Sequence, residues 1–212
     1  MVSVSADADD LTARARIRDA AMQQFGEYGF ERATIRGIAE TAGVSLGLVR
    51  HHFGSKLALR EACDAHLVKL IRRLNDQVLA GAEPEGESHV AAARIAVGPY
   101  HAYLARALVD GGAAPLFGEM VELGAQWLAD VDRTRSDPPV VTPKVRAAVS
   151  TAWALSITVL HEQVSRAMGV DVFSPEGDRL LARALIDLYA HPMLSTDDAR
   201  KALENLERHE KP

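Results

Sequence analysis

The sequence predicts an all-α fold, and three observations favour this class over one that contains a β-sheet. Nearly half of the 212 residues are hydrophobic, which is enough for a substantial core. Aromatic residues make up only 5%, whereas alanine, leucine and arginine, which favour helices over strands, are abundant. Apolar residues recur at intervals of three and four positions along most of the chain. The β-branched run at 170–173 is short and lies in a connection, so no strand is predicted.

The first quarter of the chain predicts three helices joined by short turns. Apolar residues share one face over residues 11–28, and Gly29 stands where a left-handed C-cap is expected. Thr34 is expected to cap a second helix that ends at Gly43, and Ser45 to cap a third. The first helix has two candidate N-caps, Asp10 and Thr12.

Six more helices are predicted in the remaining residues. Two of them begin with a hydroxyl residue followed by proline, a pair that caps a helix and fits its first turn. Their approximate bounds are 56–79, 89–109, 115–131, 143–168, 175–190 and 195–210. About nine helices therefore form two domains behind a flexible tail: the tail at 1–10, a three-helix domain at 11–55, and a helical body at 56–212.

Charge is unevenly distributed along the chain, although the formal net charge is −5. Residues 11–60 contain eight lysine and arginine residues and four acidic residues, whereas residues 61–212 contain sixteen and twenty-two. This asymmetry indicates a basic N-terminal module joined to an acidic body. Such a module is compatible with a nucleic-acid partner, which the overall charge alone would disfavour.

The composition also limits the cellular compartment in which the protein is expected and the metals or cofactors it can bind. Cys63 is the only cysteine, so the chain has no internal disulfide and no thiolate metal cluster. His51 and His52 are helix neighbours that diverge by about 100° and cannot chelate one metal ion together. No apolar run approaches the roughly 18 residues of a membrane span, and the N-terminus lacks a signal-peptide pattern. We therefore expect a cytoplasmic protein without membrane contact, metal or cofactor.

The segment GVSLG at 43–47 matches G-x-S-x-G, the pattern around the nucleophilic serine of many hydrolases. That arrangement requires a buried strand before the serine, whereas the preceding residues, IRGIAETA, have helical apolar spacing. A helix, a tight turn at Gly43 and a second helix form a helix-turn-helix, whose second helix can enter the major groove of DNA. The chain is therefore predicted not to be an enzyme and to have no catalytic residue. An esterase that uses Ser45 is the less favoured alternative.

The side chains of the predicted third helix also favour DNA recognition. Three residues are expected to point inward and fix the angle between the helices: Val44, Val49 and Phe53. Five are expected to face outward: Leu46, Gly47, Leu48, Arg50 and His51. An aliphatic side chain can contact a thymine methyl group, and glycine permits close approach to the bases.

Residues 12–60 also contain a long, gap-free set of positions typical of one protein family. These positions are Phe25, Gly29, Phe30, Thr34, Ile38, Ala39, Ala42, Gly43, Val44, Ser45, Gly47, Val49, His52, Phe53, Ser55, Lys56 and Leu59. In this quarter of the chain the sequence resembles the N-terminal domain of the TetR family of bacterial transcriptional repressors. The family usually has tyrosine where this chain has Arg50, which can instead hold a phosphate or read guanine.

The resemblance implies a homodimeric repressor that binds a near-palindromic, double-stranded DNA operator. It implies that a small apolar or amphipathic effector binds the helical body and releases the DNA. It further implies control of an efflux pump or of a neighbouring catabolic gene. The alternative to an effector-released repressor is a helix-turn-helix DNA-binding protein of the same fold that acts without an effector.

Ten residues are predicted to contact DNA. Thr34 and Ser45 are expected to be N-caps whatever their further role, and Arg36 is either a phosphate contact or a solvated side chain. For His52 the alternative is a hydrogen bond inside the domain. Phosphate contacts from the first helix and an exposed charged face equally explain three further basic residues: Arg14, Arg16 and Arg18. The ten predicted contacts are Thr34, Arg36, Ser45, Leu46, Gly47, Leu48, Arg50, His51, His52 and Lys56.

The body offers candidates for a ligand pocket and for a dimer interface. Both tryptophans of this aromatic-poor chain lie in the body, where flat rings suit flat apolar ligands, although core packing would also explain them. The dimer is expected to form through residues 143–190, whose helices are apolar over more of their circumference than one core face requires. The ligand candidates are Tyr103, Phe117, Met120, Trp127, Trp153 and His161.

Overall fold

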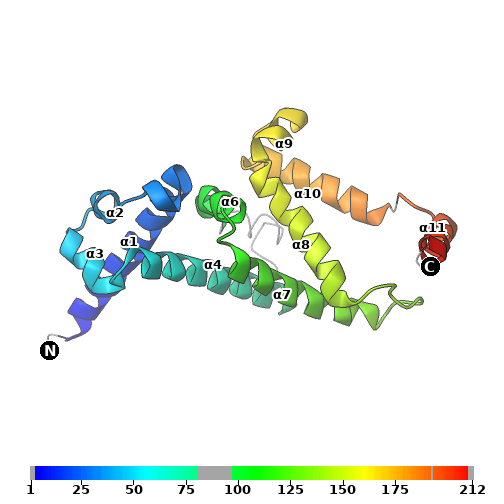
Figure 1. The fold of residues 1–212 in the computed structure, drawn as a ribbon, viewed down its shortest axis with the longest axis horizontal. Helices are drawn as coiled ribbons and strands as arrows, with labels where there is room; N and C mark the ends of the chain where they lie inside the picture. The colour runs from blue at the N-terminus through cyan, green and yellow to red at the C-terminus, as the bar shows by residue number, and fades with distance from the viewer. Residues whose placement is uncertain (1–2, 81–96, 192, 210–212) are drawn as a thin grey trace.

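The computed structural model describes residues 3–80, 97–191 and 193–209, and all regular elements in these ranges are helices. The molecule is elongated, with the N-terminal helices at one end and the C-terminal helices at the other (Figure 1). None of the helices in these ranges combines the length and the apolarity that a bilayer span requires. The all-α class that the sequence predicts is confirmed for the described residues.

The first helix, α1 (Ser3–Arg32), begins earlier than the sequence predicts. The two expected N-caps, Asp10 and Thr12, lie inside it, and the helix includes most of the predicted tail. The reason is that Ala6 and Ala8 favour helix, and extending a helix that is already nucleated costs little. Gly29 interrupts the helix with φ 78° and ψ 162°, a conformation essentially confined to glycine. The left-handed C-cap predicted here is therefore wrong, because ψ lies far from the left-handed helical region.

Two hydroxyl caps and one glycine position α2 (Ile35–Ala42) and α3 (Leu46–Phe53). Thr34 Oγ1 accepts a hydrogen bond from the amide three residues later at 3.0 Å, and Ser45 Oγ does the same at 3.1 Å. Gly43 has φ 65° and ψ 40°, a left-handed conformation that turns the chain sharply between the two helices. The predicted helix-turn-helix boundaries are therefore confirmed.

The long helix α4 (Lys56–Leu79) joins the N-terminal helices to the body. It packs against α1 and α3, and it also packs against α7 (Ala114–Asp132) (Figure 1). The predicted bounds 56–79 and 115–131 agree with these two helices to within one residue. Because α4 packs against the N-terminal helices and also against α7 of the body, it connects the two ends of the molecule.

Helix α6 (His101–Val109) follows a single 3-10 turn, η1 (Gly98–Tyr100), and packs extensively against α1. Gly26 permits this contact, because a Cβ atom there would lie 2.8 Å from the backbone nitrogen of Tyr103. The helix predicted over 89–109 is confirmed from residue 101 onward, and residues 89–96 lie outside the described ranges. Helix α6 also packs against α8 (Pro143–Val159), so it contacts both the N-terminal helices and the body.

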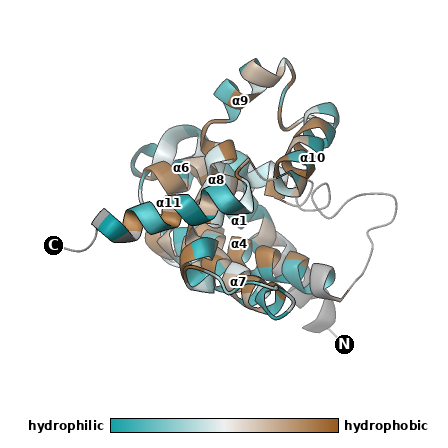
Figure 2. Cartoon of the chain, turned by 90° about the vertical axis from the view of Figure 1, so that its right-hand side faces the viewer, coloured by the Kyte–Doolittle hydropathy of each residue, from teal (hydrophilic) through white to brown (hydrophobic). Residues whose placement is uncertain are grey.

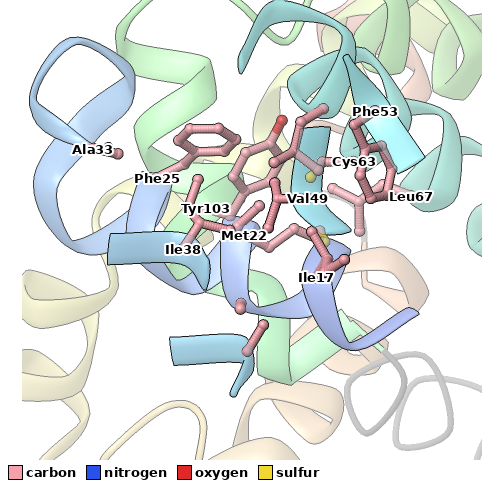
Figure 3. Packing of buried hydrophobic residues seen from close by; sticks show 14 of the residues in the cluster. Ile17, Met22, Phe25, Ala33, Ile38, Val49, Phe53, Cys63, Leu67 and Tyr103 are labelled. Atoms are coloured by element: carbon pink, nitrogen blue, oxygen red, sulfur yellow. The ribbon is translucent and has the colours of Figure 1, made fainter. Parts of the chain in front are cut away.

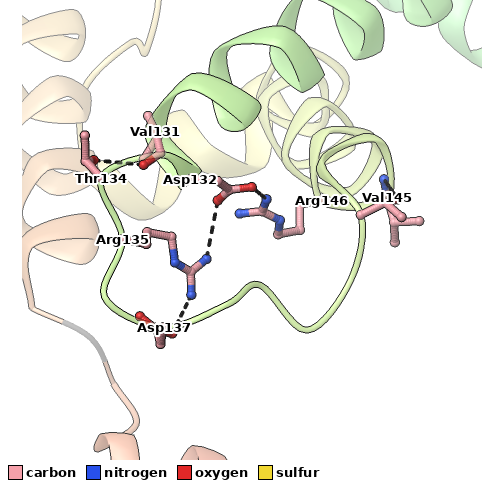
Figure 4. Close-up of polar contacts among 8 residues, drawn as sticks. Val131, Asp132, Thr134, Arg135, Asp137, Val145 and Arg146 are labelled. Atoms are coloured by element: carbon pink, nitrogen blue, oxygen red, sulfur yellow. Dashed lines mark hydrogen bonds and ion pairs between the residues drawn. The ribbon is translucent and has the colours of Figure 1, made fainter.

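Ion pairs hold the loop between α7 and α8 (Figure 4). Asp132, at the end of α7, pairs with Arg146 in the first turns of α8 and lies 3.7 Å from the guanidinium of Arg135. Arg135 also contacts Asp137 at 2.7 Å, which holds the pKa of that carboxyl below its usual value. These contacts fix the path by which α8 returns along α7, its main packing partner.

The single helix predicted over 143–168 is wrong, because the structure divides it into α8 and α9 (His161–Met168). The break lies at Leu160, which has φ −98° and ψ 21°. Three consecutive β-branched residues at 157–159 lower helix propensity just before it. The His161 ring then donates to the Thr158 carbonyl at 3.1 Å, which competes with the regular helical hydrogen bond.

The last two helices, α10 (Pro175–Ala190) and α11 (Thr196–His209), agree with the predicted bounds. Ser174 caps α10 by accepting from the Gly177 amide at 3.0 Å. Neither helix packs extensively against another described helix. Hydrophobic residues are visible along α10, whereas α11 is mostly hydrophilic (Figure 2).

One hydrophobic cluster joins the N-terminal helices to the body (Figure 3). Tyr103 of α6 packs near Phe25 of α1, with ring centroids 6.2 Å apart, and its hydroxyl donates to Asp64 at 2.5 Å. Burial raises the pKa of the Cys63 thiol, which contacts the Arg18 carbonyl, so this cysteine is a core residue. Further members are Ile17, Met22, Ile38, Val49, Leu59, Leu67, Leu104, Leu116 and Leu155.

We expect Leu59→Ala to lower the free energy of unfolding by about 2–5 kcal/mol, because it leaves a cavity in this cluster. Leu59 is 0% exposed, whereas Leu57, on the same helix, is 57% exposed. Leu57→Ala is therefore the matched control, with an expected loss below about 0.5 kcal/mol. Urea unfolding followed by circular dichroism measures both, and equal losses would contradict the assignment of Leu59 to the core.

Candidate functional site

Helix α3 lies at one end of the molecule with one face open to solvent (Figure 1). It packs against α1, α2 and α4, and none of the described body helices packs extensively against it. Val49 and Phe53 are buried on its inner side, and Val44 packs against the same cluster, as the sequence predicts. The outer face of α3 is therefore free for a partner.

The open face of α3 combines aliphatic, basic and imidazole side chains. Leu48 corrects the sequence-based expectation: it is half-buried and packs on the core cluster, because it lies one turn after Val44 on the inner side. His52 is also half-buried, with its ring centroid 5.5 Å from that of His51. The residues that do face outward as predicted are Leu46, Gly47, Arg50 and His51.

The first turns of α2 and α3 present helix N-termini to solvent. Thr34 and Ser45 are exposed at the two caps, and the amide groups behind them favour anionic partners. Arg36 is almost fully exposed, and its guanidinium lies 4.0 Å from the Glu40 carboxylate. An exposed pair at this distance leaves the guanidinium able to reach another anion.

The geometry of Ser45 is that of a helix cap. Its backbone, at φ −71° and ψ 150°, is relaxed, whereas a nucleophile elbow holds its serine in a strained turn after a strand. The Ser45 hydroxyl oxygen accepts from the Leu48 amide. The G-x-S-x-G match is therefore explained by the capping of α3.

Lys56, which the sequence predicts to contact DNA, is held inside the N-terminal domain. Its ammonium donates to the carbonyls of Phe30, Glu31 and Ala33 at 2.6, 3.2 and 3.1 Å, and lies 4.5 Å from the centroid of the Phe30 ring. These carbonyls belong to the end of α1, where a cation is favourable. In this arrangement all three ammonium donors are engaged, so Lys56 stabilises the end of α1.

The arginines of α1 also brace the helix-turn-helix. Arg16 donates to the Ala42 carbonyl at 2.5 Å, at the end of α2. The Arg14 guanidinium lies 5.3 Å from the centroid of the Phe53 ring, and Arg18 pairs with Asp19. These internal contacts are a third explanation for the basic face, beside the phosphate contacts and the exposed charged face that the sequence suggests.

Residues 17–63 match the family model described as bacterial regulatory proteins, tetR family. The matched segment contains the end of α1, the two helices of the helix-turn-helix and the start of α4. The N-terminal domain of the chain is that of the TetR family. The resemblance found in residues 12–60 is thereby confirmed.

The chain is similar to curated transcriptional regulators. It is 41% identical over 140 residues to the HTH-type transcriptional regulatory protein RaaS of Mycobacterium tuberculosis, a match that covers 65% of this chain and 66% of RaaS. The chain thus spans slightly less than two thirds of that relative.

Two solved structures share the fold. A gamma-butyrolactone receptor (ArpA like protein) superposes with a TM-score of 0.58 and 26% identity, covering 73% of this chain and 82% of that one. CprB from Streptomyces coelicolor, solved in complex with its biological operator sequence, superposes with a TM-score of 0.56 and 24% identity, covering 94% of this chain and 98% of that one. The TetR-like arrangement of an N-terminal helix-turn-helix and a helical C-terminal domain is confirmed.

The helical body contains a cavity of about 640 Å³. Helices α6, α8 and α10 and the connection before α10 form its walls. Of the six ligand candidates, Trp153 lies on the cavity wall, and His161 contacts the wall residue Phe173 with ring centroids 5.5 Å apart. Trp127 is exposed on α7, outside the cavity lining. Tyr103, Phe117 and Met120 pack in or against the core cluster.

Sequence reasoning missed most of the cavity wall. His101, Phe173 and Asp178 line it, although they lie on three different elements and share no sequence pattern. Only the packing of α6 and the placement of α10 beside α8 bring them together. No local signal in the sequence could have found them.

We expect Lys56→Met to lower the free energy of unfolding by about 1–2 kcal/mol, because it removes charged hydrogen bonds to the end of α1. Lys69 is exposed on the same helix, so Lys69→Met is the matched control and is expected to change stability by less than about 0.5 kcal/mol. Thermal and urea unfolding measure both variants. Unchanged stability in Lys56→Met would show that the carbonyl contacts contribute little.

Proposed function

We propose that this chain is a homodimeric transcriptional repressor that binds a near-palindromic, double-stranded DNA operator in the cytoplasm. The observation that carries the proposal is the open outer face of α3, held at the end of the molecule by a buried inner face. A helix exposed in this way fits the width of the DNA major groove. The similarity to RaaS, a transcriptional regulatory protein, supports it.

The exposed residues divide into those suited to phosphates and those suited to bases. Thr34, Arg36 and Ser45, at helix N-termini, suit the phosphate backbone. On α3 itself, Leu46 suits a thymine methyl group, and Arg50 suits either a guanine edge or a phosphate. We further propose that Gly47 permits close approach and that His51 and His52 add contacts from the last turn. Leu48 borders this surface, and Lys56 supports it from within.

Two copies are needed, because one recognition helix covers only a few base pairs and useful affinity requires two half-sites. Helix α8 exposes an apolar stripe at intervals of four residues, namely Val145, Val149 and Trp153. Helix α10 exposes Ile186 and Tyr189. Apolar faces of this extent favour association, and we propose that α8 and α10 of two chains form a four-helix interface.

A small-molecule effector would act through α6. Helix α6 packs against α1 at Gly26, while His101 and Leu104 of the same helix line the body cavity. A ligand that displaces α6 would therefore displace α1 and change the spacing of the two recognition helices. It can do so only through different affinities for the two spacings.

We expect Arg50→Ala to weaken operator binding by about 1–3 kcal/mol, because it removes a base or phosphate contact. Arg133→Ala, at the exposed end of α7, removes the same charge far from α3 and is the control, with little expected effect. Fluorescence anisotropy with operator DNA at several salt concentrations measures both. Wild type should bind more weakly as salt rises, with a smaller slope for Arg50→Ala if the contact is to phosphate. Equal affinity of all three proteins would remove Arg50 from the interface.

We expect Ile186→Glu to convert the dimer to monomers and to abolish operator binding, because it places a charge in the four-helix interface. Val109, on α6, is as exposed as Ile186, each being 68% exposed, so Val109→Glu controls for the charge. Analytical ultracentrifugation gives the oligomeric state, and circular dichroism verifies the fold. A wild type that sediments as a monomer, or an Ile186→Glu variant that remains dimeric, would contradict this interface.

A further inference from the structure

We propose that a hollow at the end of α1, lined by three arginines, binds a small organic oxyanion, a molecule that carries a carboxylate or a phosphate group. The hollow has a volume of about 390 Å³ and lies where α1 packs on α4 and on α6. It shares no lining residue with the body cavity or with the outer face of α3, and binding there does not rest on the proposed function. The arginines come from three helices: Arg32 of α1, Arg60 of α4 and Arg106 of α6.

Contacts within the protein fix the guanidinium groups of Arg32 and Arg60 at the wall of the hollow. The Nε atom of Arg32 donates to the Tyr28 carbonyl at 3.0 Å, which leaves its two Nη groups for another acceptor. The guanidinium of Arg60 lies over the Phe30 ring, with its central carbon 5.0 Å from the ring centroid. A ring and a carbonyl hold these groups in place without neutralising their charge, so both retain the capacity to bind an anion.

Two glycines allow the guanidinium groups to approach the backbone closely. A Cβ atom at Gly29 would lie 2.8 Å from Nη2 of Arg106, and a Cβ atom at Gly112 would overlap Nη2 of Arg60. The heads of Arg60 and Arg106 are therefore packed against the end of α1 and the turn after α6. Donors that are held in place before binding lose less conformational entropy when a ligand arrives.

The Nε atom of Arg106 is a donor that the described residues leave unsatisfied. It is buried, and the Asp110 carboxylate, although 3.4 Å away, does not have the geometry of a hydrogen bond to it. A recess of about 10 Å³ shares Arg60, Arg106 and Asp110 with the hollow, and this volume holds about one oxygen atom. Because a buried N–H without an acceptor costs free energy, a ligand oxygen bound here would remove that cost.

The balance of charge around the hollow favours an anion. The lining contains three arginines and two carboxylates, Glu31 and Asp110, which gives a net charge of +1. Outside the lining, Asp64 attracts Arg60, and the ammonium of Lys56 beside the Phe30 ring offsets that carboxylate.

The carbonyls at the end of α1 would repel an anion if they were free. Lys56 receives three of them, and Arg32 receives the carbonyl of Tyr28. With these carbonyls engaged, the arginines determine the sign of the site.

The shape of the guanidinium group identifies the ligand class. Its planar fork of N–H donors matches the paired oxygens of a carboxylate or a phosphate group. A volume of about 390 Å³ lies near the lower limit for ligand pockets, so the ligand is a small molecule. Carboxylates and phosphates share this chemistry, and both are therefore used as probes.

Isothermal titration calorimetry of the full-length protein with three probes tests the site. Succinate and inorganic phosphate are the anions, and succinamide is a neutral molecule with the size and shape of succinate. Sodium chloride is added so that all titrations have the same ionic strength, because salt screens exposed charges. We expect at least one anion to bind saturably with a Kd below about 1 mM, and at least about tenfold more tightly than succinamide. Saturation by both anions shows a general oxyanion site, and saturation by one identifies the group that is recognised.

Three variants separate the site from the general charge of the protein. Arg106→Gln is expected to weaken binding of the anion at least about tenfold, because it removes a charged donor. Arg32→Gln makes the same change at an exposed position, so it tests the site without loss of the fold. Arg133→Gln, at the exposed end of α7, is the matched control and should bind as wild type does.

Nuclear magnetic resonance of the arginine side chains gives a direct readout of the position. The Nε–H signal of Arg106, assigned by its loss in Arg106→Gln, should shift as the anion saturates the protein. The Nε–H signal of Arg133 should not shift.

Several outcomes would overturn the assignment of this site. They are failure of both anions to saturate the protein, succinamide binding as tightly as succinate, equal losses in Arg32→Gln and Arg133→Gln, or an Arg106 signal that does not move at saturation. Operator binding is measured separately on the same protein. A protein that binds operator DNA but neither anion would contradict the oxyanion site and leave the repressor proposal standing, and the reverse result would contradict the repressor proposal alone.

Discussion

The close packing of α1 on α6 is the constraint on which the rest of the structure depends. Gly26 brings the two backbones together, and Tyr103 inserts its ring into the cluster that also buries Phe25. As a result the helix-turn-helix and the body share one hydrophobic core. A change in the position of α6 therefore cannot be confined to the body, because close-packed interiors transmit displacement.

The same packing leaves two surfaces open at opposite ends of the molecule. Val49 and Phe53 fix the inner side of α3, so its outer side is exposed at one end. At the other end α10 lacks an extensive packing partner among the described helices and exposes Ile186 and Tyr189. The surface on α3 is basic and polar, which suits DNA. The surface on α10 is apolar, which suits a second copy of the chain.

Much of the N-terminal domain could be predicted because its structure is decided by local interactions. A hydroxyl cap at Thr34, another at Ser45 and a left-handed glycine at Gly43 act within a few residues, so they are visible in the sequence. The failures in this region have a different cause. Lys56 contacts carbonyls more than twenty residues earlier, which local spacing cannot show. Leu48 packs on the core cluster one turn after Val44, a spacing that the sequence does contain.

The sequence by itself determined the helical class, most helix ends and the family, because apolar periodicity, caps and glycine turns are encoded within single helices. Tertiary structure alone decided that Lys56 faces inward and that His101, Phe173 and Asp178 meet in one cavity. These outcomes depend on contacts between residues that are distant in the chain. The periodicity of apolar residues shows which face of a helix is apolar, but it does not specify which other helix will cover that face.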